Sequence, residues 1–193
     1  MELPASPAWT WVDTPLGEAL IVTSRAGVCR TVFAPPQEAW EGSPNQVLPA
    51  DFARALDEVT GLFGEPPIRD DVALKPVRDQ VEQWFSGQRQ EFDVAVDLTG
   101  VRGFRRDLYR VIQEIPYGET ASYGEVAALA GSPLAARAAG TACRDVPVSL
   151  FLPVHRVTRA NGSTGESPNS PCHRRNLLQH EAAVLGRGAS PWN

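Results

Sequence analysis

Two short helices joined by a tight glycine turn are the feature that most constrains the fold of this chain. Ser122 and Glu125 stand three positions apart before an apolar stretch, which is the pattern of a capping box and predicts a helix. Gly131-Ser132-Pro133 predicts a sharp turn, and the alanine-rich range 134–143 predicts a second helix. This order indicates a helix-turn-helix. The apolar range 148–152 predicts a strand after it, as in a winged variant.

The first half of the chain predicts a small α/β domain. Alternating and apolar stretches separated by turn residues indicate a β-meander, and helical spacing of apolar residues indicates two helices. The expected elements are strands over 9–13, 19–23 and 28–33 and helices over 52–63 and 76–86. Asp51 is expected to cap the first helix, and Pro76 to open the second, with Gly87 just past its end. The ranges 34–49 and 66–74 are expected to be irregular.

Charge also divides the chain in two. Residues 1–97 carry 7 lysines and arginines against 16 acids, a net charge of −9. Residues 98–193 carry 18 − 7 = 11 arginines against 23 − 16 = 7 acids, a net charge of +4. This asymmetry suggests that the second part meets an anionic partner, although an arginine-rich coding bias would give the same counts. We therefore expect an acidic α/β domain over 1–97 and a mostly α, DNA-binding domain over 98–193.

Composition excludes several classes of protein. The chain has 193 residues, of which 42% are hydrophobic and 21% charged, as in ordinary globular proteins. It shows neither a membrane-spanning stretch nor a secretory signal. Three cysteines are too few for a disulfide framework and favour a reducing compartment. Cys29 has no histidine or cysteine nearby to share a metal. We expect a cytoplasmic monomer without metal or cofactor, with a frayed tail over 186–193.

An apolar run that ends in a histidine–arginine pair is the most informative motif for chemistry. It reads Leu-Phe-Leu-Pro-Val-His-Arg-Val over residues 150–157. Its surroundings are typical of a nucleophile that is assisted by His155. The central residue is Val154, whose side chain can neither attack nor carry a proton. The sequence therefore predicts a site that has lost its catalytic chemistry.

Five segments place this motif in a longer frame. They are Ile-Pro-Tyr-Gly-Glu-Thr at 115–120, Ser-Tyr-Gly-Glu at 122–125, Ala-Ala-Arg-Ala-Ala-Gly at 135–140, Pro-Val-His-Arg-Val at 153–157 and Leu-Leu-Gln-His-Glu at 177–181. With this frame the chain resembles the O-6-alkylguanine-DNA alkyltransferase family over residues 9–185, specifically in the second half and loosely in the first. The family's motif is Pro-Cys-His-Arg, and its cysteine takes the alkyl group from a damaged guanine that is flipped out of DNA.

The resemblance implies a particular kind of member. Val154 stands in place of the acceptor cysteine, as in the alkyltransferase-like proteins, which bind lesions without repairing them. It also implies a ribonuclease-H-like fold for the first domain and a winged helix-turn-helix for the second. The literal string Pro-Cys-His-Arg at 171–174 does not fit the frame. Val154 precedes Glu181 by 181 − 154 = 27 positions, whereas Cys172 precedes it by only 181 − 172 = 9.

The second helix of the helix-turn-helix carries the expected DNA contacts. Its residues from Ala135 to Ala142 are small except Arg137, and Arg144 follows shortly after, which suits close approach to a minor groove with little sequence readout. A close helix–helix contact is the alternative explanation. The resemblance implies that Arg137 fills the gap left by a flipped base and that Tyr123 promotes rotation of the target phosphate. The expected DNA-binding residues are Tyr123, Ala136, Arg137, Gly140 and Arg144.

Other positions implied by the resemblance are degenerate. His155 and Glu181 match the family's base and its orienting acid, and with nothing to activate they are expected to persist as a buried hydrogen-bonded pair. Val146 replaces an asparagine before Pro147, and 167–170 reads Ser-Pro-Asn-Ser where the family has Tyr-Ser-Gly-Gly. The expected, remodelled lesion pocket comprises Val154, Ser167, Pro168 and Asn169.

Three functions remain open on the sequence alone. The first is a non-enzymatic damage sensor that binds double-stranded DNA containing O-6-alkylguanine and marks it for a repair-pathway protein. The second is a general minor-groove binder or protein-interaction scaffold without lesion preference. It is suggested by Val146, at the family's hinge before Pro147, and by the altered substrate loop at 167–170. The third is a residual enzyme that uses Cys172 or Cys143 as the alkyl acceptor.

Overall fold

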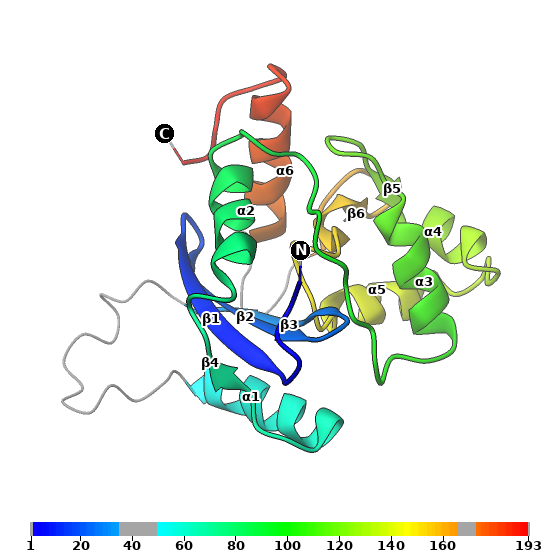
Figure 1. Cartoon of the computed structure of the whole chain (residues 1–193). Coiled ribbons are helices and arrows are strands. Elements are labelled where there is room, and N and C mark those ends of the chain that lie inside the picture. The colour runs from blue at the N-terminus through cyan, green and yellow to red at the C-terminus, as the bar shows by residue number, and fades with distance from the viewer. Residues whose placement is uncertain (1, 35–49, 166–172, 193) are drawn as a thin grey trace. The chain divides into compact units, whose positions relative to one another are not determined.

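The computed structural model describes residues 2–34, 50–165 and 173–192, and it divides the chain into two compact units. The units are Met1–Thr99 and Gly100–Asn193, so the division lies two residues after the Asp97 boundary expected from charge. The first unit is built on a β-sheet and the second is mostly helical (Figure 1). Among the described residues, no helix combines the length and the apolar character needed to cross a membrane.

A four-stranded sheet organises the first unit. It contains β1 (Ala8–Thr14), β2 (Gly17–Ser24), β3 (Gly27–Phe33) and β4 (Ile68–Arg69), in the order β3-β2-β1-β4. The pairs β1–β2 and β2–β3 are antiparallel, which confirms the β-meander. The short β4 runs parallel to β1 in a range expected to be irregular. The sequence did not reveal it because two exposed residues are too few to show alternation.

Two helices pack on this sheet. α1 (Ala50–Phe63) buries Phe52, Ala55 and Val59 against residues of β1, β2 and β3, and α2 (Lys75–Phe85) packs against β1. In Figure 1 the two helices lie on opposite sides of the sheet. Residues on both faces of β2 are therefore shielded, and every residue of β2 is buried. The all-apolar centre of this strand reflects that double coverage.

The ends of these helices follow the sequence only in part. Pro76 stands in the first turn of α2 as expected, and Gly87 follows the helix with φ +75°. Asp51 was expected to precede α1 as a cap, but it lies inside the first turn. Its carboxylate instead accepts a hydrogen bond of 2.6 Å from Arg54. The aspartate thus engages a neighbouring side chain one turn along and not a free backbone N–H group.

Helices dominate the second unit. Its elements are α3 (Phe104–Gln113), β5 (Ala121–Ser122), α4 (Tyr123–Leu129), α5 (Ala136–Arg144), the 3-10 helix η2 (Val154–Arg156), β6 (Val157–Thr158) and α6 (His173–Val184). The capping box is confirmed, because the Ser122 hydroxyl accepts from the Glu125 N–H and the Glu125 carboxylate accepts from the Ser122 N–H. The turn at Gly131, with φ +78°, separates α4 from α5.

Two expectations for the second unit were wrong. The range 148–152 is not a strand: it turns at Leu150, which has φ +73°, and the Leu152 N–H donates to the Val148 carbonyl. The apolar residues of this run indicate only that it is buried, and a compact turn can bury them as well as a strand can. The tail was expected to fray, yet the Trp192 indole N–H donates to Nδ1 of the buried His180 at 3.0 Å. The half-buried, hydrogen-bonded indole of Trp192 holds this part of the tail against α6.

Candidate functional site

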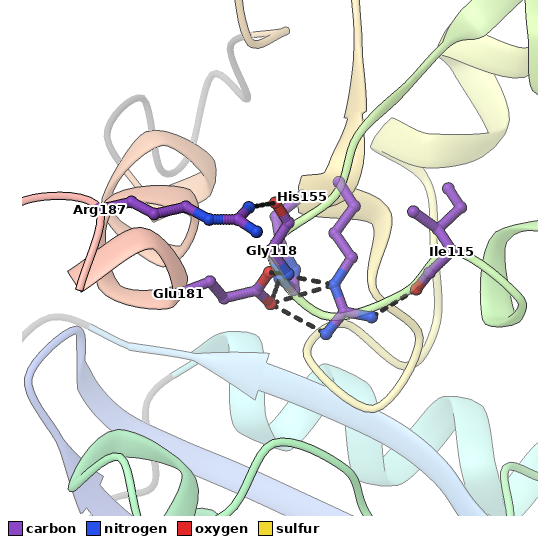
Figure 2. Close-up of polar contacts among 6 residues, drawn as sticks. Ile115, Gly118, His155, Glu181 and Arg187 are labelled. Carbon is purple, nitrogen blue, oxygen red and sulfur yellow. Dashed lines mark hydrogen bonds and ion pairs between the residues drawn. The ribbon is translucent and has the colours of Figure 1, made fainter. Parts of the chain in front are cut away.

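A buried carboxylate lies at the centre of the second unit. Glu181, on α6, is 0% exposed, and the hydrogen-bond partners of its carboxylate come from outside that helix. Arg156 donates three hydrogen bonds to it, of 2.9 to 3.2 Å, and the Gly118 N–H donates another at 2.7 Å. Figure 2 shows these contacts converging on Glu181. A buried charge of this kind is tolerated because it is paired and fully hydrogen-bonded.

His155 completes the cluster around Glu181. Its Nε2 lies 2.7 Å from Glu181 Oε1, and the ring is 2% exposed. Burial lowers the pKa of His155, because the Arg156 charge already balances the carboxylate and a second cation would be poorly solvated. Burial alone would raise the pKa of Glu181, but the hydrogen bonds from His155 and Arg156 hold it below its usual value. The pair is thus a neutral imidazole donating to a carboxylate.

The 3-10 helix η2 determines where Val154 lies. Val154 begins this helix, is 4% exposed, and donates its N–H to the Leu152 carbonyl at 2.8 Å. It does not line the open pocket described below. Val146, at the expected hinge, is half-buried and does not line it either. Ser167, Pro168 and Asn169, the other members of the expected lesion pocket, lie outside the described residues.

An open pocket of about 610 Å³ brings the expected DNA-binding residues together. Its lining contains all five of them, namely Tyr123, Ala136, Arg137, Gly140 and Arg144. Tyr123 comes from the first turn of α4 and the other four come from α5. The small side chains of α5 therefore border a hollow and not a second helix along this face. This arrangement favours a ligand-binding surface over the alternative of close helix packing.

The pocket is strongly positive. Arg137, Arg144, Arg159 and Arg174 line it, and no acidic residue of the described ranges does. Arg144 is paired with Asp145 at 3.0 Å, just outside the lining. Arg137 is exposed and forms no ion pair with any residue of 2–34, 50–165 or 173–192. Unpaired guanidinium groups around a hollow suit an anionic ligand, and phosphate above all.

Seven of the twelve lining residues were missed by the sequence analysis, and four of them, Arg159, Ala160, Gly165 and Arg174, come after η2 in the chain. Arg159 follows β6, Gly165 lies seven positions after the end of that strand, and Arg174 is the second residue of α6. Arg174 belongs to the Pro-Cys-His-Arg string that the spacing had rejected as the acceptor motif. The sequence analysis considered only Cys172 of this string as a functional residue, and Cys172 lies outside the described residues. No periodicity or composition marks these positions, because they meet only when β6 and α6 fold against α5.

The described cysteines are poor nucleophiles. Burial raises the pKa of Cys29 to about 12 and that of Cys143 to about 11, and both are free thiols. The reactive form of cysteine is the thiolate, so both are inert near neutral pH. Within the part of the chain that the structure describes, no group of three or more histidine, cysteine or acidic residues is arranged to hold a metal ion.

Comparison with known proteins gives a consistent result. Residues 103–183 match the model of the 6-O-methylguanine DNA methyltransferase, DNA binding domain. The chain is 46% identical over 84 residues to a methylated-DNA–protein-cysteine methyltransferase of Mycolicibacterium paratuberculosis, a match over 44% of this chain and only 50% of that relative. It is 32% identical over 175 residues to a DNA base-flipping protein of Thermus thermophilus, covering 90% of this chain and 99% of that one.

A solved structure extends the likeness to the whole fold. A crystal structure of Mycobacterium tuberculosis OGT in complex with DNA superposes with a TM-score of 0.70 at 26% identity, covering 96% of this chain and 96% of that chain. The similarity thus includes the sheet-based first unit as well as the helical second unit. The mixed α/β architecture described above is shared with that enzyme.

Proposed function

This chain belongs to the O6-methylguanine-DNA methyltransferase family, and on that premise we propose that it binds double-stranded DNA without transferring an alkyl group. It is a member of the alkyltransferase-like type. It recognises O-6-alkylguanine by flipping the nucleotide out of the duplex, and it leaves the repair to another protein. The base-flipping relative, which the chain matches over nearly its whole length, supports this assignment.

One observation carries the non-catalytic part of the proposal. Valine occupies the acceptor position in Pro-Val-His-Arg, and it has no atom that can bond to an alkyl carbon. His155 and Glu181 nevertheless keep their hydrogen bond of 2.7 Å beside it. The acid remains useful without a nucleophile, because Glu181 also neutralises Arg156 and accepts from the Gly118 N–H. The couple therefore serves structure rather than proton transfer.

The pocket on α5 supports DNA as the ligand. Its four arginines supply the charge that phosphates need, and the small residues of α5 allow close approach of a backbone to a narrow groove. Arg137 is exposed at the second position of α5, where its side chain can enter the duplex. Flipping costs a few kcal/mol, least at a weakened lesion pair, and an inserted arginine offsets part of that cost by stacking.

The finer architecture is part of the same proposal. We interpret α4, the turn at Gly131 and α5 as a helix-turn-helix whose second helix enters the minor groove. The first unit is interpreted as a ribonuclease-H-like domain. The wing has no strand at 148–152, and the two-stranded sheet of β5 and β6 is its only candidate among the described residues.

One substitution favours a second candidate function. Val146 cannot make the side-chain hydrogen bonds that an asparagine would make at the hinge before Pro147. A weakened hinge would leave the charged surface of α5 intact while the specific recognition of a lesion base is lost. The alternative is therefore a general minor-groove DNA-binding protein, or a protein-interaction scaffold, without lesion preference.

Binding to matched duplexes separates the two candidates. The experiment measures the affinity for one duplex with and without a single O6-methylguanine, at fixed salt because electrostatic affinity depends on it. Tighter binding to the lesion duplex supports the sensor, and equal binding supports the alternative. Arg137→Ala should weaken binding to the lesion duplex. Arg110→Ala, which removes an equal charge from the exposed side of α3, should change it much less. Equal affinity of Arg137→Ala and the parent for the lesion duplex would contradict the proposal of a damage sensor.

Intact-mass measurement tests the absence of transfer. After incubation with lesion duplex, the parent protein should show no added methyl group. The measurement also covers Cys172, whose surroundings are not described. A mass increase of one methyl group that persists in Cys143→Ser and vanishes in Cys172→Ser would make the chain a residual enzyme.

A further inference from the structure

Arg174 joins three elements at one edge of the pocket. Its Nη1 donates to the Tyr123 hydroxyl oxygen at 3.0 Å, and its Nη2 donates to the Cys143 carbonyl at 2.5 Å. That carbonyl belongs to the last turn of α5, where carbonyl groups lack partners within the helix. Arg174, on α6, thereby fixes the end of α5 and the tip of a side chain on α4.

Gly165 keeps this contact open. A Cβ atom at position 165 would lie 2.4 Å from the Tyr123 hydroxyl oxygen and 3.2 Å from Arg174 Nη1. The first distance is far below van der Waals contact, so any side chain there would displace the hydroxyl from the guanidinium. The absence of a side chain at position 165 is therefore a condition for the hydrogen bond between Arg174 and Tyr123.

The direction of the hydroxyl proton follows from this geometry. A tyrosine hydroxyl has one proton to donate and lone pairs to accept with, whereas a guanidinium only donates. Because Arg174 occupies an acceptor position of the oxygen, the phenolic proton must turn away from it. Tyr123 and Arg174 both line the pocket, so the proton is available to an acceptor bound there.

We propose that Arg174 is a positioning residue that holds the Tyr123 hydroxyl as a hydrogen-bond donor to DNA in the pocket. This inference rests on the proposed DNA binding and adds a specific role for a residue outside the helix-turn-helix. The acceptor on DNA is either a phosphate oxygen next to the target nucleotide or an acceptor atom of the flipped base. A phenol can donate to both, and the two sources are separable by experiment.

A double-mutant cycle tests the coupling of the two side chains. Affinity for the lesion duplex is measured for the parent, Tyr123→Phe, Arg174→Met and the double variant. Tyr123→Phe should weaken binding by about three- to tenfold, the ordinary worth of one hydrogen bond. Arg174→Met should weaken binding less in the phenylalanine background than in the parent, by about the factor that Tyr123→Phe costs alone. Independent, multiplying losses would overturn the proposal.

Arg159→Met provides the matched control. It removes an equal charge from the same pocket, and the hydrogen bonds found for its guanidinium go to Ser163 and not to Tyr123. Its loss should multiply with that of Tyr123→Phe. Loss of a cation that neutralises a phosphate also lowers the salt dependence of binding, whereas loss of a neutral hydroxyl does not. The salt slope should therefore fall with Arg159→Met in both backgrounds, and it should be unchanged by Tyr123→Phe.

Gly165→Ala keeps the test decisive if Arg174→Met does not fold. In the parent it should weaken DNA binding, because its Cβ would displace the Tyr123 hydroxyl. In the Tyr123→Phe background, which lacks the hydroxyl oxygen, the same substitution should be nearly neutral. An equal loss in both backgrounds would contradict the proposal.

The source of the acceptor is identified with a duplex that carries an abasic site in place of the lesion. If the hydroxyl donates to the base, Tyr123→Phe costs nothing on that duplex. If it donates to a phosphate, the cost is the same on both duplexes. A parent protein that binds no DNA at all would overturn the proposed function and this inference with it. A parent that binds DNA but shows no coupling would overturn this inference alone.

Discussion

At the residue scale, the contacts of Glu181 give this acid a structural role that does not depend on a nucleophile. Its carboxylate accepts from Arg156, His155 and Gly118, which belong to η2 and to the turn before β5. Arg156 in turn donates to the Ile115 carbonyl at 2.6 Å. Removing the acid would leave Arg156 buried without its counter-charge, which is far more costly than losing an exposed ion pair.

Glu181→Gln should therefore lower the free energy of unfolding by about 3 kcal/mol or more, because it leaves a buried cation unpaired. Urea unfolding measures this. Glu119→Gln is the control, since Glu119 forms an exposed ion pair of 3.5 Å with Arg187 and should contribute less than about 1 kcal/mol. Similar losses for the two variants would show that the cluster around Glu181 does not stabilise the fold.

Val154→Cys should not by itself restore efficient transfer. The new thiol would be buried, which raises its pKa, and Val146 and the altered 167–170 segment would remain. Intact mass after incubation with O6-methylguanine duplex measures transfer, with the parent as the blank. Rapid methylation of this single variant would show that the other two departures from the family have little effect.

At the element scale, α5 combines a smooth surface with one residue, Gly140, that weakens the helix. Gly140 lies in its middle, lines the pocket, and has no atom within 4 Å of a Cβ built on it. Glycine in a helix interior costs roughly 1 kcal/mol relative to alanine. The open space around Gly140 means that folding does not require glycine there, so the requirement is expected to come from the ligand.

Gly140→Leu should consequently leave thermal stability equal or higher. It should nevertheless weaken DNA binding by tenfold or more, which corresponds to a binding free energy of about 1.4 kcal/mol or more, because the new side chain would clash with DNA in the groove. Ala138→Leu places the same side chain on an exposed position of α5 outside the pocket, and it should bind like the parent. Thermal melts and fluorescence anisotropy measure the two quantities. Unchanged affinity for Gly140→Leu would exclude close approach of DNA to α5.

At the scale of the whole molecule, the buried titratable groups predict how stability depends on pH. Burial lowers the pKa of His155 and of His173 below the usual 6.5, so unfolded chains bind protons first as the pH falls. The pKa of Glu181 lies below the usual 4.5 despite burial, because of its hydrogen bonds from His155 and Arg156. Both kinds of shift make the folded state lose stability on acidification.

The free energy of unfolding should therefore be nearly flat between about pH 7 and about pH 8, fall below pH 6.5 as the unfolded chains protonate their histidines, and fall further below pH 4.5. Urea titrations at a series of pH values measure it. His155→Gln should reduce the fall in the free energy of unfolding between pH 6.5 and pH 4.5. The part of the fall that comes from His173 should remain. A histidine variant with the parent's profile would show that His155 does not titrate with folding.

The sequence by itself determined the local elements and which side chain stands at position 154. The capping box, the glycine turn and the helical spacing depend on neighbouring residues, so they could be read directly and are confirmed for α4. Val154 excludes a nucleophile in any fold. The family resemblance around Val154 and Glu181 predicted that His155 and Glu181 form a buried pair, and this pair is present.

Only the tertiary structure decided which distant residues share the pocket and how apolar segments are shaped. Arg174 and Gly165 meet Tyr123 across 51 and 42 positions of the chain, a contact that no local pattern encodes. The run at 148–152 and the tail at Trp192 were mistaken for a strand and a frayed end. Hydrophobicity specifies that a residue is buried, whereas the packing of the other elements determines the backbone conformation in which it is buried.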